Sequence, residues 1–152
     1  MSAAPKIYFE DFHVGMTRER DLPVLSEDDI IEFASKYDPQ AFHTDRERAR
    51  DSLYGGLIAS GWHTVSLCMR AICEAYLLEA ASLGSPGVQD LRWLKPVRAG
   101  DRLRMKMTVE AAKPSQSKPD RGSVLHRWEL FDDKNELVMD MTGWGMFRRR
   151  PA

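Results

Sequence analysis

The feature that most constrains this chain is a long apolar stretch from Gly61 to Leu83. Its small, aliphatic and aromatic residues fall on more than one side of a helix, and a helix that is apolar nearly all round belongs inside a molecule. Gly84, Pro86 and Gly87 follow it and are typical of a helix end. The stretch therefore predicts one long, buried helix around which the rest of the fold is built.

The chain after Val88 shows the period of two that is typical of strands. Apolar side chains that would face a core alternate with polar ones that would face water, and this happens in three segments: 103–109, 124–131 and 137–147. Residues 132–135 (DDKN) carry a hairpin turn signal. In a chain of 152 residues, few folds other than a helix wrapped by an antiparallel sheet bury such a helix. We therefore predict an α+β fold, in a single domain over residues 1–152.

The segment before the apolar stretch contains a shorter helix. Ser26 can cap its first turn, and one face carries Ile30, Phe33, Ala34 and Tyr37. The helix must end near Asp38, because Pro39 disfavours helical geometry in the residue before it. Residues 16–24 are expected to be extended, residues 44–51 to form one or two exposed turns, and residues 113–122 to form a polar loop.

Charge and composition exclude several classes of function. The net charge is −1, so there is no basic excess to hold nucleic acid. No segment has the apolar length of a membrane span, and the N-terminus lacks the apolar run of a signal peptide. Two cysteines, Cys68 and Cys73, point in different directions on a helix and cannot bridge each other. We expect a cytoplasmic protein that binds neither nucleic acid nor membrane.

The residues best suited to chemistry are Asp38 and His43, five positions apart at a helix end. Each alone is more often structural than functional. A proline turn can fold the chain back so that the carboxylate and the imidazole face one point, where they would offer one base and one acid. Such a pair suits the movement of water across a double bond. Gln40, between them, could hydrogen-bond to substrate or water.

Ser60 and Gly61 stand where the long helix begins. The amides of a first helical turn have no partner within the helix, so the Gly61 amide and the helix dipole could stabilise an enolate on a thioester carbonyl. Glycine here would let the substrate approach closely, while Ser60 is expected to cap the helix and to lie among the substrate-binding residues. His63, on the first turn, either contacts substrate or is structural.

These segments resemble the MaoC-like dehydratases and (R)-specific enoyl-CoA hydratases. The resemblance rests on Asp-x4-His at 38–43, Ile-Ala-Ser-Gly-Trp-His-Thr at 58–64 and Leu-Lys-Pro-Val-Arg-Ala-Gly-Asp at 94–101. It implies a hot-dog fold, a homodimer, and syn addition of water to a trans-2-enoyl-CoA. It also implies catalytic roles for Asp38 and His43 and an oxyanion-hole role for Gly61. The chain departs from the family's Gly-Asp-x-Asn-Pro-Leu-His motif at Tyr37, Gln40 and Ala41.

Two other functions remain open on the sequence. A hot-dog acyl-CoA thioesterase would use an acid on the central helix, where Glu74 and Glu79 are the candidates. The departures from the family motif would also suit a non-catalytic acyl-binding homologue. The spacing of histidines, cysteines and acids matches no known metal motif, so we expect no metal and no cofactor beyond the CoA of the substrate.

Overall fold

A computed structural model describes residues 3–152; Met1 and Ser2, at the start of the expected domain, lie outside the described residues. The helices are α1 (Glu27–Tyr37), α2 (Ala41–Thr44), α3 (Arg46–Arg50) and α4 (Gly61–Ala75), with 3-10 turns at Phe9–Asp11 and Leu77–Glu79. The strands are β1 (Thr17–Asp21), β2 (Ser82–Gly84), β3 (Gln89–Trp93), β4 (Arg104–Pro114), β5 (Arg121–Phe131) and β6 (Leu137–Arg148).

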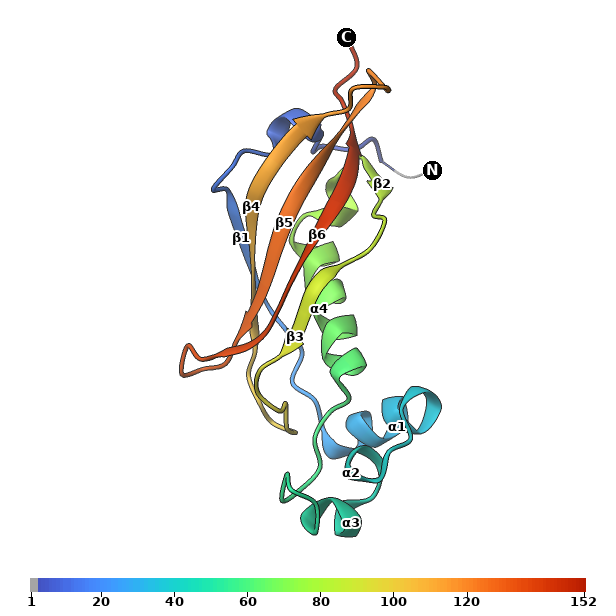
Figure 1. Cartoon of the computed structure of the whole chain (residues 1–152), viewed down its shortest axis with the longest axis vertical. Helices are drawn as coiled ribbons and strands as arrows, with labels where there is room; N and C mark the ends of the chain where they lie inside the picture. The colour runs from blue at the N-terminus through green and yellow to red at the C-terminus, as the bar shows by residue number, and fades with distance from the viewer. Residues whose placement is uncertain (1–2) are drawn as a thin grey trace.

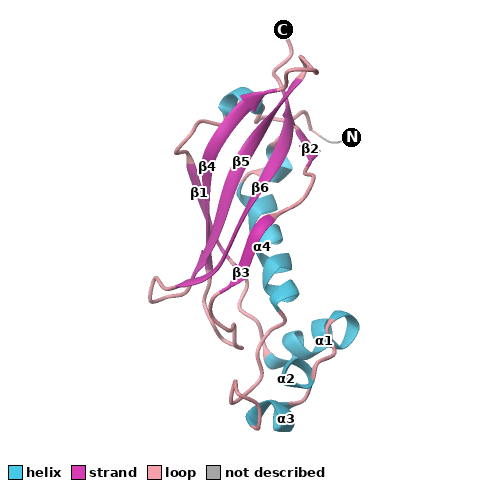
Figure 2. Ribbon diagram, viewed as in Figure 1, coloured by secondary structure: helices cyan, strands magenta, loops and turns pink. Residues whose placement is uncertain are grey.

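The strands form one antiparallel sheet in the order β1-β4-β5-β6-β2, and β3 also pairs with β6. Helix α4 runs along one face of this sheet (Figure 1). The three shorter helices cluster beyond the end of the sheet, beside the first turn of α4, while the first described residues and the C-terminus lie at the opposite end (Figure 2). The predicted α+β architecture, one helix against a wrapped antiparallel sheet, is confirmed.

The alternation read from the sequence is the physical reason for the long strands. Along β5, every second residue is buried, because successive side chains of a strand point to opposite faces. The hairpin between β5 and β6 turns at 132–135, where Asn135 takes a left-handed conformation (φ 59°). The expected loop at 113–122 is shorter than predicted, because β4 runs to Pro114 and β5 starts at Arg121.

The long helix was predicted to reach Leu83, and this is wrong. Helix α4 ends at Ala75, and Tyr76 leaves helical geometry with φ −161°. Beyond it, Tyr76 packs in the core, Leu77–Glu79 forms a 3-10 turn in which Leu78 is 75% exposed, and Ser82–Gly84 pairs with the end of β6. The continuous apolar run therefore contains a helix, a 3-10 turn and a short strand, and only part of it is buried.

The expectation that this helix is buried all round is also wrong. Cys68, Ala71 and Ile72 are buried against the sheet, whereas Trp62 and Met69 are 56% and 43% exposed. One apolar face of α4 is thus left uncovered by its own chain. Within residues 3–152, no helix is long and apolar enough to cross a membrane.

Helix α1 follows its prediction closely. The Ser26 side chain accepts a hydrogen bond from the Asp29 amide, and the Asp29 side chain accepts one from the Ser26 amide. This reciprocal capping box fixes where the helix starts. Ile30 and Ala34 are buried, and the helix ends at Tyr37, one residue before Asp38.

Candidate active site

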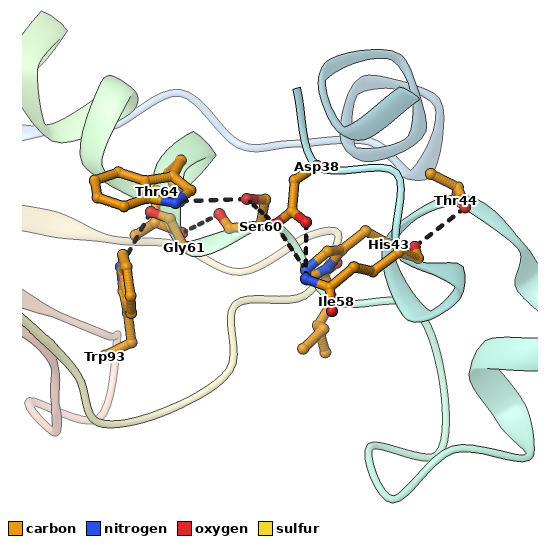
Figure 3. A network of polar contacts seen from close by, with 10 residues as sticks. Asp38, His43, Thr44, Ile58, Ser60, Gly61, Thr64 and Trp93 are labelled. Carbon is orange, nitrogen blue, oxygen red and sulfur yellow. Dashed lines mark hydrogen bonds and ion pairs between the residues drawn. The ribbon is translucent and has the colours of Figure 1, made fainter. Parts of the chain in front are cut away.

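The end of α1 and the short helix α2 bring Asp38 and His43 together. Asp38 caps the C-terminus of α1, and its amide still donates to the Ala34 carbonyl. Pro39 then prevents the helix from continuing, and α2 starts one residue after Gln40. The His43 Nε2 atom lies 3.3 Å from Asp38 Oδ2. The expected fold-back of the two side chains toward one point is what the structure shows (Figure 3).

The orientation of the His43 ring is fixed by the backbone. Its Nδ1 atom lies 2.7 Å from the carbonyl oxygen of Ile58. A carbonyl only accepts hydrogen bonds, so Nδ1 carries a proton. In the neutral ring, Nε2 is then a bare acceptor that faces the Asp38 carboxylate. Two adjacent acceptors of this kind suit the binding of a water molecule, which donates two hydrogen bonds.

The Asp38 carboxylate is held by two further donors. The Ser60 hydroxyl donates to Oδ2 at 2.7 Å, and the Gln40 side-chain amide donates to Oδ1 at 2.8 Å. Burial by itself raises the pKa of Asp38, but the hydrogen bonds from Ser60 and Gln40 and the nearby His43 outweigh it, so the pKa lies below its usual value. The carboxylate is therefore ionised at neutral pH and able to act as a base.

Ser60 connects this carboxylate to the start of α4. Its hydroxyl oxygen accepts a hydrogen bond from the Trp62 amide at 3.3 Å, which confirms the predicted helix cap. The next residue, Gly61, opens the helix, and its N–H belongs to the first turn, where the helix offers no acceptor. The positive end of the α4 dipole thus lies next to Asp38 and His43.

Asp38, Gln40, His43 and Gly61 line one cavity of about 440 Å³. Pockets of this size hold small molecules. Most of the other walls come from apolar and aromatic residues far apart in the sequence, among them Phe42, Tyr54, Trp93, Leu94 and Val97. A larger hollow of about 760 Å³ lies at the other end of the molecule, but there Glu10 and Arg149 neutralise each other in an ion pair.

One expected substrate contact does not reach the cavity. His63 is buried against Phe33, with the two rings stacked at 4.3 Å, and it faces a separate groove beside α1. Of the other two expected substrate contacts, Gln40 lines the cavity and Ser60 is fully buried, and both hydrogen-bond to Asp38. These two side chains therefore orient the carboxylate.

Sequence reasoning missed Trp93 and the Ile58 carbonyl. Trp93 lies 32 positions from Gly61, and its indole Nε1–H donates to the Gly61 carbonyl at 3.0 Å. No local pattern could have indicated these contacts, because sheet pairing places Trp93 and backbone geometry places the Ile58 carbonyl. Within residues 3–152, no three His, Cys, Asp or Glu side chains gather as metal ligands; the expectation of no metal and no cofactor stays a prediction.

A single long helix packed along a wrapped antiparallel sheet is the hot-dog fold, and in this chain an acid and a histidine lie beside the first turn of that helix. The family follows from direct comparison. A model of the MaoC like domain matches residues 11–126, and the chain belongs to this family.

Three known proteins illustrate the similarity. The crystal structure of the MaoC-like dehydratase from Rhodospirillum rubrum is 38% identical, with a TM-score of 0.87 over 96% of this chain and 99% of that one. The R-hydratase PhaJ1 from Pseudomonas aeruginosa, at 23% identity, shares the fold with a TM-score of 0.78 over 95% and 87% of the two chains. The uncharacterized protein YdeM of Bacillus subtilis is 27% identical over 71% of this chain and 77% of its own.

Proposed function

We propose that this protein adds water reversibly to the double bond of a trans-2-enoyl-CoA to give a 3-hydroxyacyl-CoA. The observation that carries the proposal is the Asp38–His43 pair, with its fixed ring tautomer, in one cavity with Gly61. The pair takes a proton from water and later returns it to the substrate, and the helix start supplies a site for negative charge. Hydration of the double bond of an enoyl thioester requires both.

The pair holds the attacking water. One hydrogen of that water points to the Asp38 carboxylate and the other to His43 Nε2, so its oxygen lone pair is free to attack. As the C3–O bond forms, one water proton passes to the pair, and the electrons of the double bond move to the thioester oxygen. General acid–base catalysis of this kind contributes about 10²–10⁴-fold to a rate.

Gly61 stabilises the enolate that results. The thioester oxygen gains negative charge during attack, and an amide N–H at the positive end of α4 lowers the energy of that charge. The proton held by the pair is then delivered to C2, through His43, on the same face of the substrate. The C2–H bond forms, the carbonyl is restored, and the pair returns to its starting charge.

Similar proteins support the reaction class. The Rhodospirillum rubrum protein is described as a MaoC-like dehydratase, and dehydration is the reverse of the proposed reaction. The R-hydratase PhaJ1 shows that the fold accommodates hydration. At 23% identity, it carries no argument about the substrate of this chain.

The surroundings of Glu74 and Glu79 argue against the thioesterase alternative. Glu74 is paired with Arg20 and Arg70, and Glu79 with Lys6. Neither lines the cavity that holds Asp38 and Gly61. No carboxylate of the central helix is therefore placed to activate a water against the thioester carbonyl there.

The test is an assay of the protein with crotonyl-CoA and with longer enoyl-CoAs. We expect the absorbance of the conjugated enoyl thioester to fall while no free thiol appears. Release of thiol would instead indicate a thioesterase, and the absence of both signals at every chain length would indicate a non-catalytic acyl-binding protein.

A further inference from the structure

The indole of Trp93 covers Gly61 at the start of α4. A Cβ atom added to Gly61 would lie 2.7 Å from both Cδ2 and Cζ2 of Trp93, and closer still to Cε2. Side chains do not tolerate carbon contacts this short, so only glycine fits at position 61 while the indole is in place. Close approach of substrate was the expected reason for this glycine, but the close neighbour in the structure is Trp93.

Trp93 also holds Gly61 by a hydrogen bond. Its Nε1–H donates to the Gly61 carbonyl oxygen at 3.0 Å, and the edge of its ring meets Trp62 with centroids 5.3 Å apart at 81°. The Trp93 indole thus restrains Gly61 in two ways: its ring packs against the Gly61 Cα atom, and its N–H donates to the Gly61 carbonyl oxygen.

The position of Trp93 is in turn set by the sheet. Trp93 ends β3, where it pairs with Met139 of β6, and the next two amides, of Leu94 and Lys95, donate to the Val138 carbonyl at 2.8 and 3.2 Å. The backbone of Trp93 therefore cannot shift without breaking this part of the sheet. Its side chain transmits that rigidity to the first turn of α4.

We propose that Trp93 is a positioning residue that aims the Gly61 N–H at the enolate oxygen, and that glycine stands at position 61 to admit its indole. This inference rests on the proposed hydration reaction. A donor stabilises developing charge only when it is held in place beforehand, and a displacement of about 1 Å can cost roughly 10²-fold in rate. Trp93 contacts the Cα and the carbonyl of Gly61, so it acts through that residue.

A double-mutant cycle tests the coupling, using Gly61→Ala, Trp93→Ala and the double variant. We expect Gly61→Ala alone to lower kcat by roughly 10²-fold, because the methyl displaces the indole and with it the amide. In the Trp93→Ala background the same substitution should cost little, because the space is empty. If Gly61→Ala lowers kcat by the same factor with and without Trp93, the proposal is overturned. A residue other than Trp93 would then be the reason why only glycine fits at position 61.

Two controls separate positioning from simpler roles. Gly61→Ala combined with Trp144→Ala, a tryptophan on β6 outside the cavity, should show additive losses. Trp93→Phe keeps a ring but removes the Nε1–H donor, so kcat should fall by about 3- to 10-fold at every acyl chain length, with KM little changed. A change in chain-length preference with full crotonyl-CoA turnover would make Trp93 a wall of the acyl pocket instead.

Failure of the hydratase proposal can be distinguished from failure of this one. If the unmodified protein does not hydrate any enoyl-CoA, the proposed function is wrong and Trp93 positions no oxyanion donor. If the unmodified protein is active and the effects of the two substitutions on kcat are additive, the hydratase proposal is supported and only the proposed role of Trp93 is wrong. Thermal unfolding of all variants shows whether a loss of rate reflects loss of the fold.

Discussion

At the scale of single residues, the charge of Asp38 depends on its neighbours. Burial favours the neutral acid, whereas the hydrogen bonds from Ser60 and Gln40 favour the carboxylate, and the net effect is a lowered pKa. Asp38 must lose its proton before it can accept one from water. The acidic limb of the pH–rate profile should therefore include the ionisation of this residue.

Replacement of Ser60 by alanine should shift the acidic limb of the pH–rate profile to higher pH. Without the hydroxyl donor, the pKa of Asp38 rises, so a higher pH is needed to ionise it, and the acidic limb of kcat/KM shifts to higher pH. Loss of the helix cap should also cost about 1 kcal/mol of stability. The measurement is kcat/KM for crotonyl-CoA across the acidic range.

Ser66→Ala is the matched control for this shift. Ser66 lies on the same helix, is exposed, and donates to the Trp62 carbonyl, so its loss should leave the acidic limb where it is. A limb that stays in place in Ser60→Ala would mean that Asp38 is not the group whose ionisation limits the reaction.

Local sequence patterns predicted the positions of some site residues but not of others. Asp38, His43 and Gly61 lie together because a helix end, a proline and a helix start are local features. For His63 the sequence left substrate contact and a structural role both open; it lies two residues after Gly61, about 200° around an α-helix, and so points away from the cavity. The bond from Ser60 to Asp38 joins positions 22 apart, and no local pattern encodes it.

At the scale of elements, His126 of β5 lies in an aromatic cluster with Trp128 of the same strand and Tyr76, the residue that follows α4. The His126 ring stacks on Trp128 and on Tyr76, with centroids 5.1 and 5.8 Å away. Its two nitrogens have no hydrogen-bond partner among the described residues. Burial lowers the pKa of His126 to about 4, so the ring stays neutral in the folded protein at neutral pH.

This histidine should make the fold weaker in mild acid. Between its ordinary pKa of about 6.5 and its folded value of about 4, the unfolded chain binds a proton that the folded chain does not, so stability falls as pH falls. Linkage gives a loss of about 2 kcal/mol between pH 7 and pH 5. In His126→Phe, this contribution should disappear, as measured by urea unfolding at the two pH values.

The exposed His13 provides the comparison. His13→Gln should retain the full pH dependence of the unmodified protein. If His126→Phe loses as much stability in acid as the unmodified protein does, the buried histidine is not the source of the effect.

Local sequence patterns predicted which helices and strands form better than where each of them ends. The period of two in 124–131 correctly indicated β5, because one face of that strand packs on α4 and the other meets water. The apolar run 61–83 was read as one helix, although Tyr76 breaks it. An apolar run looks alike in sequence whether it forms one helix or, as at 77–84, a 3-10 turn followed by a short strand.

At the scale of the whole molecule, several large apolar side chains near β3 are exposed to solvent. Four apolar side chains on α4 and around the neighbouring β3 are exposed: Met69 of α4, Val88 before β3, and Trp93 and Leu94 at the end of β3, at between 43% and 52%. In the described chain β3 pairs only with β6, and an unpaired strand edge can pair with another chain. We infer that a second copy covers these side chains, as the homodimer expected from the sequence requires.

The mass in solution tests this inference. We expect sedimentation to give about twice the chain mass of 17.4 kDa. Val88→Asp places a charge in the proposed interface, so it should give the monomer at the same concentration, because burial of an unpaired charge is costly. Val14→Asp, at an exposed site near β1, should remain dimeric; a monomeric unmodified protein would contradict the inference.

The central claim is that Asp38 and His43 move water onto an enoyl thioester, and Asp38→Asn tests it most directly. The amide preserves the size of the side chain but cannot accept a proton, so the initial rate of crotonyl-CoA hydration should fall at least about 100-fold. Thermal unfolding should show the variant folded, and Asp51→Asn, an exposed aspartate after α3, should keep the full rate. If Asp38→Asn hydrates crotonyl-CoA as fast as the unmodified protein, the reaction does not depend on this carboxylate and the account is wrong.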